Sequence, residues 1–312
     1  MIAFIFPGQG SQKVGMGQAL ANAFPECRAV FDEADAALGE PLSRLCFEGP
    51  DDQLRLTENT QPALLTTSIA AARLLDARGI RPAVMAGHSL GEYSAHVAAG
   101  TFSIADAVRI VRRRGRYMQE AVPVGTGAMA AVLGLDRDLV AQACAEAAEG
   151  EVVSPANLNA PGQVVISGTS GGVLRAGERA RALGARRVVP LPVSAQFHCA
   201  LMRPAEERLA PELRAMAVST PRVPVVANVD AQMKTDAASA IEALVRQVSA
   251  PVRWEEVVSV LASAGVRAYV EVGPGTVLSG LVRKIDREAR VATFETPADL
   301  DAVERLVQEV TV

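Results

Sequence analysis

The sequence has no uninterrupted apolar stretch near the roughly 20 residues that a membrane-spanning helix needs, although 49% of its 312 residues are hydrophobic. Positive charge is not in excess either, because the formal net charge of −4 argues against broad attraction to nucleic acid or to an anionic membrane surface. The first residues, MIAFIFPGQG, lack the basic segment and the length of a signal peptide, and they are typical of a buried strand that enters a glycine turn. We therefore expect a compact, soluble, cytoplasmic protein that binds neither nucleic acid nor membrane.

Cysteine and histidine are both scarce. The four cysteines, at positions 27, 46, 144 and 199, show no CxxC spacing, which favours free thiols in a reducing compartment over a disulfide framework or a zinc site. We predict no metal site. Only three histidines are available, so a histidine acting as general base must be His88, His96 or His198.

Short apolar runs alternate with helix-period segments along most of the chain. Runs of strand length occur at residues 2–6, 83–86, 223–227 and 269–272, and the segments between them are rich in alanine and leucine. This alternation predicts a largely parallel sheet covered by helices, which is an α/β fold.

The pattern changes near residue 125. From there to about residue 193, the sequence predicts a strand (128–133), a helix (136–148), two strands around the turn 159–162, a helix (173–183) and a strand (187–191). This β-α-β-β-α-β order is the ferredoxin-like arrangement. We predict a large α/β core from residues 1–124 and 196–312, a small inserted ferredoxin-like subdomain at 125–195, and a functional site in the cleft between them.

A glycine-flanked serine follows the second apolar run. The sequence GHSLG at 87–91 is a G-x-S-x-G pattern, and a helix-forming stretch (92–99) comes directly after it. This is the context of a nucleophile elbow, in which a sharp turn projects the serine above the sheet and the helix amides stabilise developing negative charge. Ser89 is thus the candidate nucleophile, against the alternative of an ordinary glycine-rich strand-to-helix turn.

A serine hydroxyl needs a base at neutral pH. His88 adjoins Ser89 in a turn that points successive side chains apart, so we interpret it as a structural or site-wall residue. His96 lies about two turns along the following helix and is interpreted as a surface or packing residue. His198 stands in a loop just after the predicted subdomain returns to the core, and is the candidate base. No Asp or Glu is nominated as its partner, so a backbone carbonyl or an amide could hold the imidazole tautomer.

The first glycine loop, FPGQGSQ at 6–12, does not fit a nucleotide site. Lys13 stands where a dinucleotide fingerprint has its third glycine, and no Walker A pair follows. The remaining interpretation is a tight loop that brings a backbone N–H, that of Gln9, close to a reacting atom as one half of an oxyanion hole.

An arginine run, RRRGR at 112–116, lies in a helical stretch after the elbow. Such runs are usually solvated, and successive helix positions point about 100° apart, so these side chains cannot all face one way. An arginine that faces the cleft would recognise a carboxylate and would select a dicarboxylic thioester over a simple fatty acyl group.

Several spaced motifs resemble those of the malonyl-CoA:acyl-carrier-protein transacylases of bacterial fatty acid synthesis. In chain order they are FPGQGSQ (6–12), TQPALL (60–65), GHSLGEYSA (87–95), RGRYMQEAVP (114–123), NAPGQVVISG (159–168), HCALM (198–202), RQVSAPVRW (246–254) and EVGPG (271–275). The resemblance covers nearly the whole chain and implies an α/β-hydrolase-like core with a ferredoxin-like insert. It implies that malonyl moves from coenzyme A to acyl carrier protein, so the coenzyme A thioester is a substrate and no cofactor is expected.

The resemblance also implies a role for each of several residues. Ser89 is the implied nucleophile, His198 the base and Arg114 the clamp for the malonyl carboxylate. The implied oxyanion hole consists of the backbone amides of Gln9 and Leu90. Gln247 is implied to orient His198, and the predicted substrate site is completed by Gln61, His88, Asn157 and Phe197.

The residue before the histidine, Phe197, bears on acyl selectivity. Related polyketide acyltransferases with phenylalanine there tend to select malonyl, and those with serine select methylmalonyl, so we expect malonyl here. The carrier could serve fatty acid or polyketide synthesis. A serine thioesterase or hydrolase and a catalytically silent carrier-binding module are the rival interpretations. We expect a monomer whose partners are malonyl-CoA and acyl carrier protein.

Overall fold

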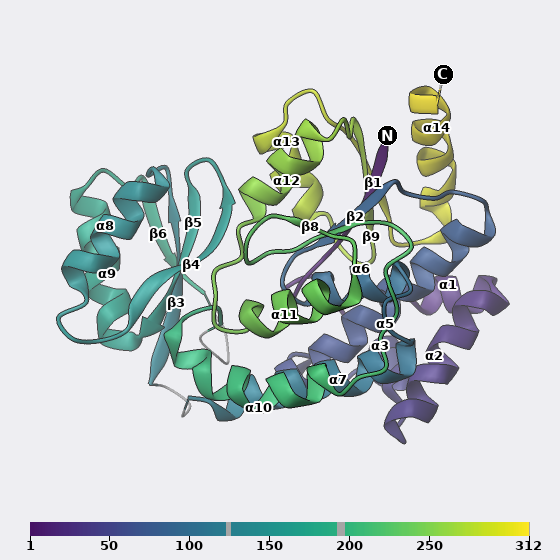
Figure 1. The fold of residues 1–312 in the computed structure, drawn as a ribbon, viewed down its shortest axis with the longest axis horizontal. Coiled ribbons are helices and arrows are strands. Elements are labelled where there is room, and N and C mark those ends of the chain that lie inside the picture. Colours follow the sequence, from purple (N-terminus) through teal and green to yellow (C-terminus); the bar gives the residue numbers. More distant parts are fainter. Residues whose placement is uncertain (123–125, 192–196, 312) are drawn as a thin grey trace.

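Two β-sheets organise the chain, a larger one within a helical core and a smaller one beside it (Figure 1). The computed structural model describes residues 1–122, 126–191 and 197–311. Within them the larger sheet has the strand order β10-β9-β1-β2-β7-β8, and its neighbouring strands are parallel except for β7 and β8. In that order the strands are Arg290–Phe294, Ala268–Val272, Ile2–Phe6, Val84–Gly87, Val225–Val226 and Met233–Lys234.

The β1 strand lies between β9 and β2 and is buried along its whole length. Phe4 and Phe6 join one hydrophobic cluster, whereas Ala3 and Ile5 join the cluster on the other face, as the two-residue period of a strand requires. Because both faces are covered, the strand is an unbroken apolar run. The pairing of Phe6 with Gly87 brings the loop after β1 beside the loop after β2.

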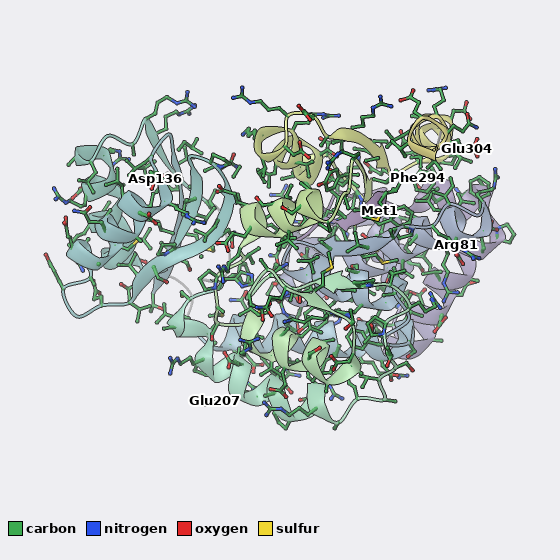
Figure 2. All side chains as sticks on the ribbon, turned by 45° about the horizontal axis from the view of Figure 1, so that its top comes forward. Met1, Arg81, Asp136, Glu207, Phe294 and Glu304 are labelled. Carbon is green, nitrogen blue, oxygen red and sulfur yellow. The ribbon has the colours of Figure 1, made fainter. Side chains whose placement is uncertain are left out.

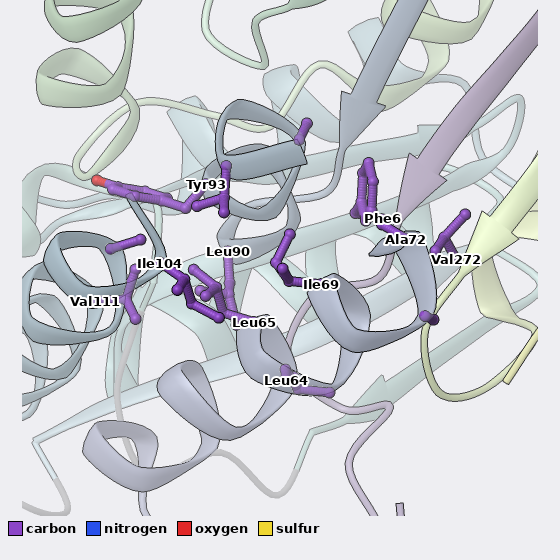
Figure 3. Close-up of a cluster of buried hydrophobic side chains, with 14 of the residues drawn as sticks. Phe6, Leu64, Leu65, Ile69, Ala72, Leu90, Tyr93, Ile104, Val111 and Val272 are labelled. Atoms are coloured by element: carbon purple, nitrogen blue, oxygen red, sulfur yellow. The ribbon is translucent and has the colours of Figure 1, made fainter. Parts of the chain in front are cut away.

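Helices cover both faces of the larger sheet. On one face lie α2 (Pro25–Leu38), α5 (Thr57–Ala77), α6 (Leu90–Ala98) and α7 (Ile104–Glu120), and on the other lie α12 (Trp254–Ser263) and α13 (Val277–Ile285). Figure 3 shows Leu65, Leu90 and Val111, from α5, α6 and α7, in the core that these helices share. Apart from the two helices on the smaller sheet, the remaining helices are α1 (Gln18–Ala23), α3 (Leu42–Glu48), α4 (Asp51–Leu54), α10 (Arg203–Arg214), α11 (Ala237–Gln247), α14 (Leu300–Thr311) and the 3₁₀ turns Ala200–Met202 and Pro297–Asp299.

The smaller sheet is antiparallel and has the strand order β4-β5-β3-β6. Its elements along the chain are β3 (Gly127–Leu133), α8 (Arg137–Ala147), β4 (Val153–Ala160), β5 (Gln163–Thr169), α9 (Ser170–Ala182) and β6 (Arg187–Pro190). The predicted β-α-β-β-α-β order is therefore confirmed. Both helices pack on one face, and the opposite face contributes Met129 and Val165 to a small cluster with Phe197.

The predicted α/β fold class, with a mainly parallel sheet and a small antiparallel sheet, is confirmed. The predicted subdomain boundaries, at 124/125 and 195/196, lie outside the described residues, and the division into two domains stays a prediction. Two strands, β8 and β10, were not predicted. None of the described helices is both long and apolar enough to span a membrane.

Candidate active site

Ser89 lies in a strained turn between β2 and α6. Its backbone has φ 53° and ψ −107°, and non-glycine residues seldom adopt a positive φ. The side chain of Asn228 holds the turn from two sides, because its Oδ1 accepts a hydrogen bond from the Ser89 amide and its Nδ2 donates to the Gly87 carbonyl, both at 2.7 Å. A Cβ on Gly91 would lie 2.0 Å from the carbonyl oxygen of Phe6, so a glycine is required for this packing of α6 on β1.

His198 is the imidazole that meets the serine. Its Nε2 lies 2.7 Å from Ser89 Oγ, and its Nδ1 lies 2.9 Å from the carbonyl oxygen of Gln247 and 3.2 Å from that of Ala250. Two carbonyl acceptors require a proton on Nδ1, which leaves Nε2 free to accept the serine proton. Burial, together with the positive charge of Arg114, lowers the pKa of His198 to about 3, so the ring is neutral at physiological pH.

Arg114 projects from α7 toward Ser89 and is 2% exposed. Its Nη2 donates to Ser89 Oγ at 3.2 Å and to Gln247 Oε1 at 2.9 Å, and its Nη1 donates to Gln61 Oε1 at 2.8 Å. The guanidinium also lies 5.4 Å from the ring centroid of Tyr93, a cation–π contact. In the described part of the chain no carboxylate lies within ion-pairing distance of it, so its charge is not cancelled by a direct partner.

Glu92 and Gln247 form a buried polar network below the elbow. The side-chain Nε2 of Gln247 donates to the Ser89 carbonyl at 2.9 Å and to Glu92 Oε2 at 2.7 Å. Glu92 Oε2 also accepts a hydrogen bond from the backbone N–H of Asn228 at 2.9 Å. Burial raises the pKa of Glu92 to about 7. The side chain of Gln247 thus fixes Arg114 and the elbow, whereas its main-chain carbonyl is the group that orients His198.

The loop after β1 is tied to the same network. A Cβ on Gly8 would lie 2.5 Å from the carbonyl oxygen of His88, so this glycine lets the loop pack directly on the elbow. The side-chain Oε1 of Gln9 accepts from Thr57 Oγ1 at 2.8 Å, and Thr57 in turn accepts from Gln61 Nε2 at 3.1 Å. Among the residues that the structure describes, no hydrogen bond occupies the backbone amide of Gln9 or of Leu90.

These groups surround a small cavity of about 60 Å³. It is lined by Gln9, Gln61, His88, Ser89, Leu90, Arg114, Met129, Asn157, Phe197 and His198. Every predicted site residue except Gln247 therefore lines one cavity, and Gln247 lies directly behind Ser89. The His88 Nε2 is 2.9 Å from Asn159 Oδ1, which fixes that ring as part of the wall. The buried Oδ1 of Asn157 has no hydrogen-bond partner among the described residues and can accept from a ligand.

Sequence reasoning missed three residues of this site. Glu92 and Asn228 complete the buried network, and Met129 brings the smaller sheet to the cavity wall. A signal existed for Asn228, because it follows the apolar run 223–227 at the carboxyl edge of a parallel sheet, where ligand sites of α/β proteins lie. Glu92 resembled an ordinary acidic residue in the first turn of a helix, and its burial was not visible in the sequence.

Known proteins are similar to this chain over nearly its whole length. A model of the acyl transferase domain family matches residues 3–298. The malonyl CoA-acyl carrier protein transacylase of Salmonella typhimurium is 53% identical to the chain over 301 residues, which cover 96% of this chain and 97% of the relative. The chain belongs to the malonyl CoA-acyl carrier protein transacylase family.

Solved structures of this transacylase family share the whole fold. The acyl carrier protein S-malonyltransferase of Vibrio cholerae superimposes with a TM-score of 0.95 at 48% identity, covering 97% of this chain and 99% of that one. A malonyl-transacylase solved in complex with a type II polyketide synthase acyl carrier protein also has a TM-score of 0.95, at 46% identity and covering 98% of this chain and 99% of that one. The chain is therefore a transacylase that acts as an acyl-carrier-protein S-malonyltransferase.

Proposed function

We propose that this transacylase works by a ping-pong mechanism through a malonyl ester on Ser89. The observation that carries the proposal is the 2.7 Å contact between Ser89 Oγ and the neutral His198 Nε2. In the first half-reaction, His198 takes the serine proton while Oγ attacks the thioester carbonyl of malonyl-CoA. The tetrahedral intermediate then collapses, the C–S bond breaks, and the coenzyme A thiolate takes the proton from His198.

The second half-reaction runs the same steps in reverse order. His198 removes the proton of the carrier phosphopantetheine thiol, and the sulfur attacks the ester carbonyl. The C–O bond to Ser89 breaks and the serine recovers its proton from His198. In both halves we assign the oxyanion to the amides of Gln9 and Leu90, which the described residues leave unoccupied beside the nucleophile. All the chemistry comes from side chains and the thioester, so we propose that neither cofactor nor metal takes part.

We assign Arg114 to the free carboxylate of the malonyl group. The support is a buried guanidinium with only neutral hydrogen-bond partners, 3.2 Å from the nucleophile, in a cavity of about 60 Å³ that has little room for a long acyl chain. A guanidinium matches the two oxygens of a carboxylate. We place Gln61, His88, Asn157 and Phe197 around the acyl group and its thioester on the basis of their positions in the cavity wall.

The carrier has two candidate sources. Acyl carrier protein of fatty acid synthesis is our first choice, because curated relatives at 49% and 53% identity are malonyl CoA-acyl carrier protein transacylases. A polyketide synthase carrier is the alternative, because one solved relative is bound to such a carrier. We also propose that the enzyme is cytoplasmic and that it acts as a monomer. The monomer is proposed because one chain supplies every residue of the site. Light scattering of the purified protein tests the oligomeric state.

Intact-mass analysis tests the covalent step. Brief exposure to malonyl-CoA is expected to add one malonyl group, which peptide mapping places on Ser89, and Ser89→Ala is expected to acquire none. Steady-state kinetics with carrier are expected to give parallel double-reciprocal lines. An adduct on Ser89→Ala would overturn the nucleophile, intersecting lines would indicate a ternary complex, and release of free malonate in preference to transfer would identify a hydrolase.

A further inference from the structure

A second and larger cavity, of about 530 Å³, lies at the far end of the helices that form the active site. It is bounded by the middle and end of α5, the end of α6, the start of α7 and the segment that leads into β2. It shares no lining residue with the cavity around Ser89. Figure 2 shows Arg81, a residue of its rim, on the side of the core away from the smaller sheet.

The inner wall of this cavity is apolar. It is formed by Phe4, Ile69, Ala72, Ile80, Met85, Val97, Phe102 and Ile104, all buried in the protein. Pockets of about 300 to 1,000 Å³ with such walls are of the size that encloses a small organic ligand. The wall offers no charged group, so the part of a ligand that enters it must be apolar.

The rim carries charges of both signs, with one more arginine than carboxylates. Three exposed arginines, Arg73, Arg81 and Arg222, face two exposed carboxylates, Asp76 and Glu33. The Arg81 guanidinium is paired with Asp76 at 3.1 Å, and Arg222 Nη2 donates to the Ala98 carbonyl at 2.9 Å. In the described part of the chain Arg222 has no ion pair, and Arg73 has neither a hydrogen bond nor an ion pair, so the Arg73 guanidinium is free to bind a ligand.

We propose that this cavity binds a straight-chain fatty carboxylate, with its alkyl chain against the apolar wall and its carboxylate on Arg73. One uncommitted guanidinium fits a single negative charge, and it binds a carboxylate in a bidentate manner. The apolar wall then supplies most of the binding free energy. Each methylene buried is expected to tighten binding roughly fourfold. The proposal does not depend on the mechanism assigned to Ser89.

Three helices connect this cavity to the catalytic centre. α5 carries Gln61 toward the centre and Arg73 at the cavity, α6 begins at Leu90 and ends at the cavity with Ala98, and α7 reaches from the cavity wall to Arg114. The two ends lie roughly 12 to 18 Å apart along each helix axis, at about 1.5 Å per residue. A ligand here cannot touch a malonyl group at Ser89, so we expect it not to compete with that substrate.

Calorimetric titration of the full-length enzyme with dodecanoate, below its micelle concentration, tests the proposal. One saturable site is expected, with affinity falling roughly fourfold per methylene through decanoate and octanoate. Arg73→Glu is expected to weaken binding at least tenfold. The matched variant Arg78→Glu, at the C-cap of the same helix but outside the cavity lining, is expected to change it less than twofold. Ala72→Phe fills the cavity and is expected to abolish binding, while Ser89→Ala is expected to leave it unchanged.

Several outcomes would overturn the proposal. Equal effects of Arg73→Glu and Arg78→Glu would show that Arg73 does not bind the carboxylate. Equal affinity for dodecanol and dodecanoate would show that the cavity does not recognise a carboxylate at all. Competition of dodecanoate with malonyl-CoA, or loss of binding in Ser89→Ala, would place the ligand in the active site. Binding of many molecules per chain would indicate a detergent effect. Arg73 is exposed, so its variant is expected to fold and decides the matter even if Ala72→Phe does not.

Discussion

The α7 helix presents two very different sets of arginines within a few residues. On its outer side Arg113 and Arg116 form exposed ion pairs, with Glu212 at 2.5 Å and with Glu120 at 2.8 Å. On its inner side Arg114 is buried and its hydrogen bonds go to two amide oxygens and one hydroxyl. The same side chain therefore occurs on one helix in a paired, hydrated state and in an unpaired, dehydrated state.

The difference indicates what the buried arginine is for. A buried cation that lacks a direct anionic partner is costly, because desolvation is not repaid by an ion pair. Neutral oxygens hold the Arg114 guanidinium in place without cancelling its charge. The carboxyl of Glu92 is connected to the guanidinium only through the side-chain amide of Gln247, which hydrogen-bonds to both. Such a site is ready for an anion that arrives with the substrate. The outer arginines, whose charges are already matched, can only contribute to the surface.

The largest effect is expected from removing the buried cation. Arg114→Ala should lower kcat/KM for malonyl-CoA by roughly 30- to several-thousand-fold, because truncating one member of a buried charge pair costs about 2 to 5 kcal/mol. The acyl group of acetyl-CoA has no free carboxylate, so its turnover should fall much less and the malonyl-to-acetyl ratio should collapse. Initial rates with both thioesters measure that ratio.

Thermal unfolding of Arg114→Ala serves as the control, since lost packing would depress both substrates alike. If the folded variant keeps the wild-type ratio of malonyl to acetyl transfer, the carboxylate is recognised elsewhere and the contrast between the two sides of α7 has no functional meaning.

A smaller, pH-dependent effect is expected from Glu92. Its pKa, raised by burial to about 7, makes the carboxyl mostly neutral at pH 6 and mostly ionised at pH 8. Ionisation adds a negative charge behind Gln247, close to Arg114, and opposes the malonyl carboxylate. The KM for malonyl-CoA should therefore rise a few-fold from pH 6 to 8 in the wild type, and should stay flat in Glu92→Gln, whose amide oxygen can still accept from Gln247. His198 titrates near pH 3, well below this window.

The free energy of unfolding should also depend on the ionisation of Glu92, and it should fall as the pH rises. Because the folded-state pKa of Glu92 lies above its ordinary value of 4.5, its contribution to the free energy of unfolding is present below pH 4.5 and is lost as pH rises through 7. Urea unfolding at pH 6 and 8 should show a smaller loss in Glu92→Gln than in the wild type. Identical pH profiles for KM and stability in the two proteins would contradict a titrating Glu92.

The sequence predicted the parts of the fold that repeat a strong local pattern. The apolar run 2–6 coincides with β1, and the predicted turn segment 159–162 covers the end of β4 and the two residues that connect it to β5, because buried strands and tight turns have distinct compositions. The strand β10 (Arg290–Phe294) was missed because it lies at the sheet edge and begins with a charged, exposed residue. Its place beside β9 depends on tertiary pairing that no short window shows.

The candidate site divides in the same way. Ser89 is marked by its motif, and the scarcity of histidine points to His198. The 112–116 run itself does not show which of its arginines faces inward, because that depends on how α7 is rotated against α5. Only the family resemblance singled out Arg114. The partner of the His198 Nδ1 was equally invisible, since a main-chain carbonyl leaves no signature in the sequence.

The smallest effects are expected from substitutions on the outer side of α7. They test whether the exposed, paired arginines are without influence on acyl selectivity, in contrast to Arg114. Arg113→Ala removes one exposed ion pair with Glu212, and such pairs contribute about 0 to 1 kcal/mol and are screened by salt. Urea unfolding should show a loss within that range at low salt and almost none at 1 M salt. The kcat/KM values for malonyl-CoA and acetyl-CoA should each stay within about twofold of wild type, because the Arg113 charge is matched before any substrate arrives. Arg116→Ala, which breaks the pair with Glu120, should behave the same way in the kinetic assays. A shift in the malonyl-to-acetyl ratio in either variant would show that charge on the outer side of α7 reaches the acyl group, and selectivity could then no longer be assigned to the buried cation alone.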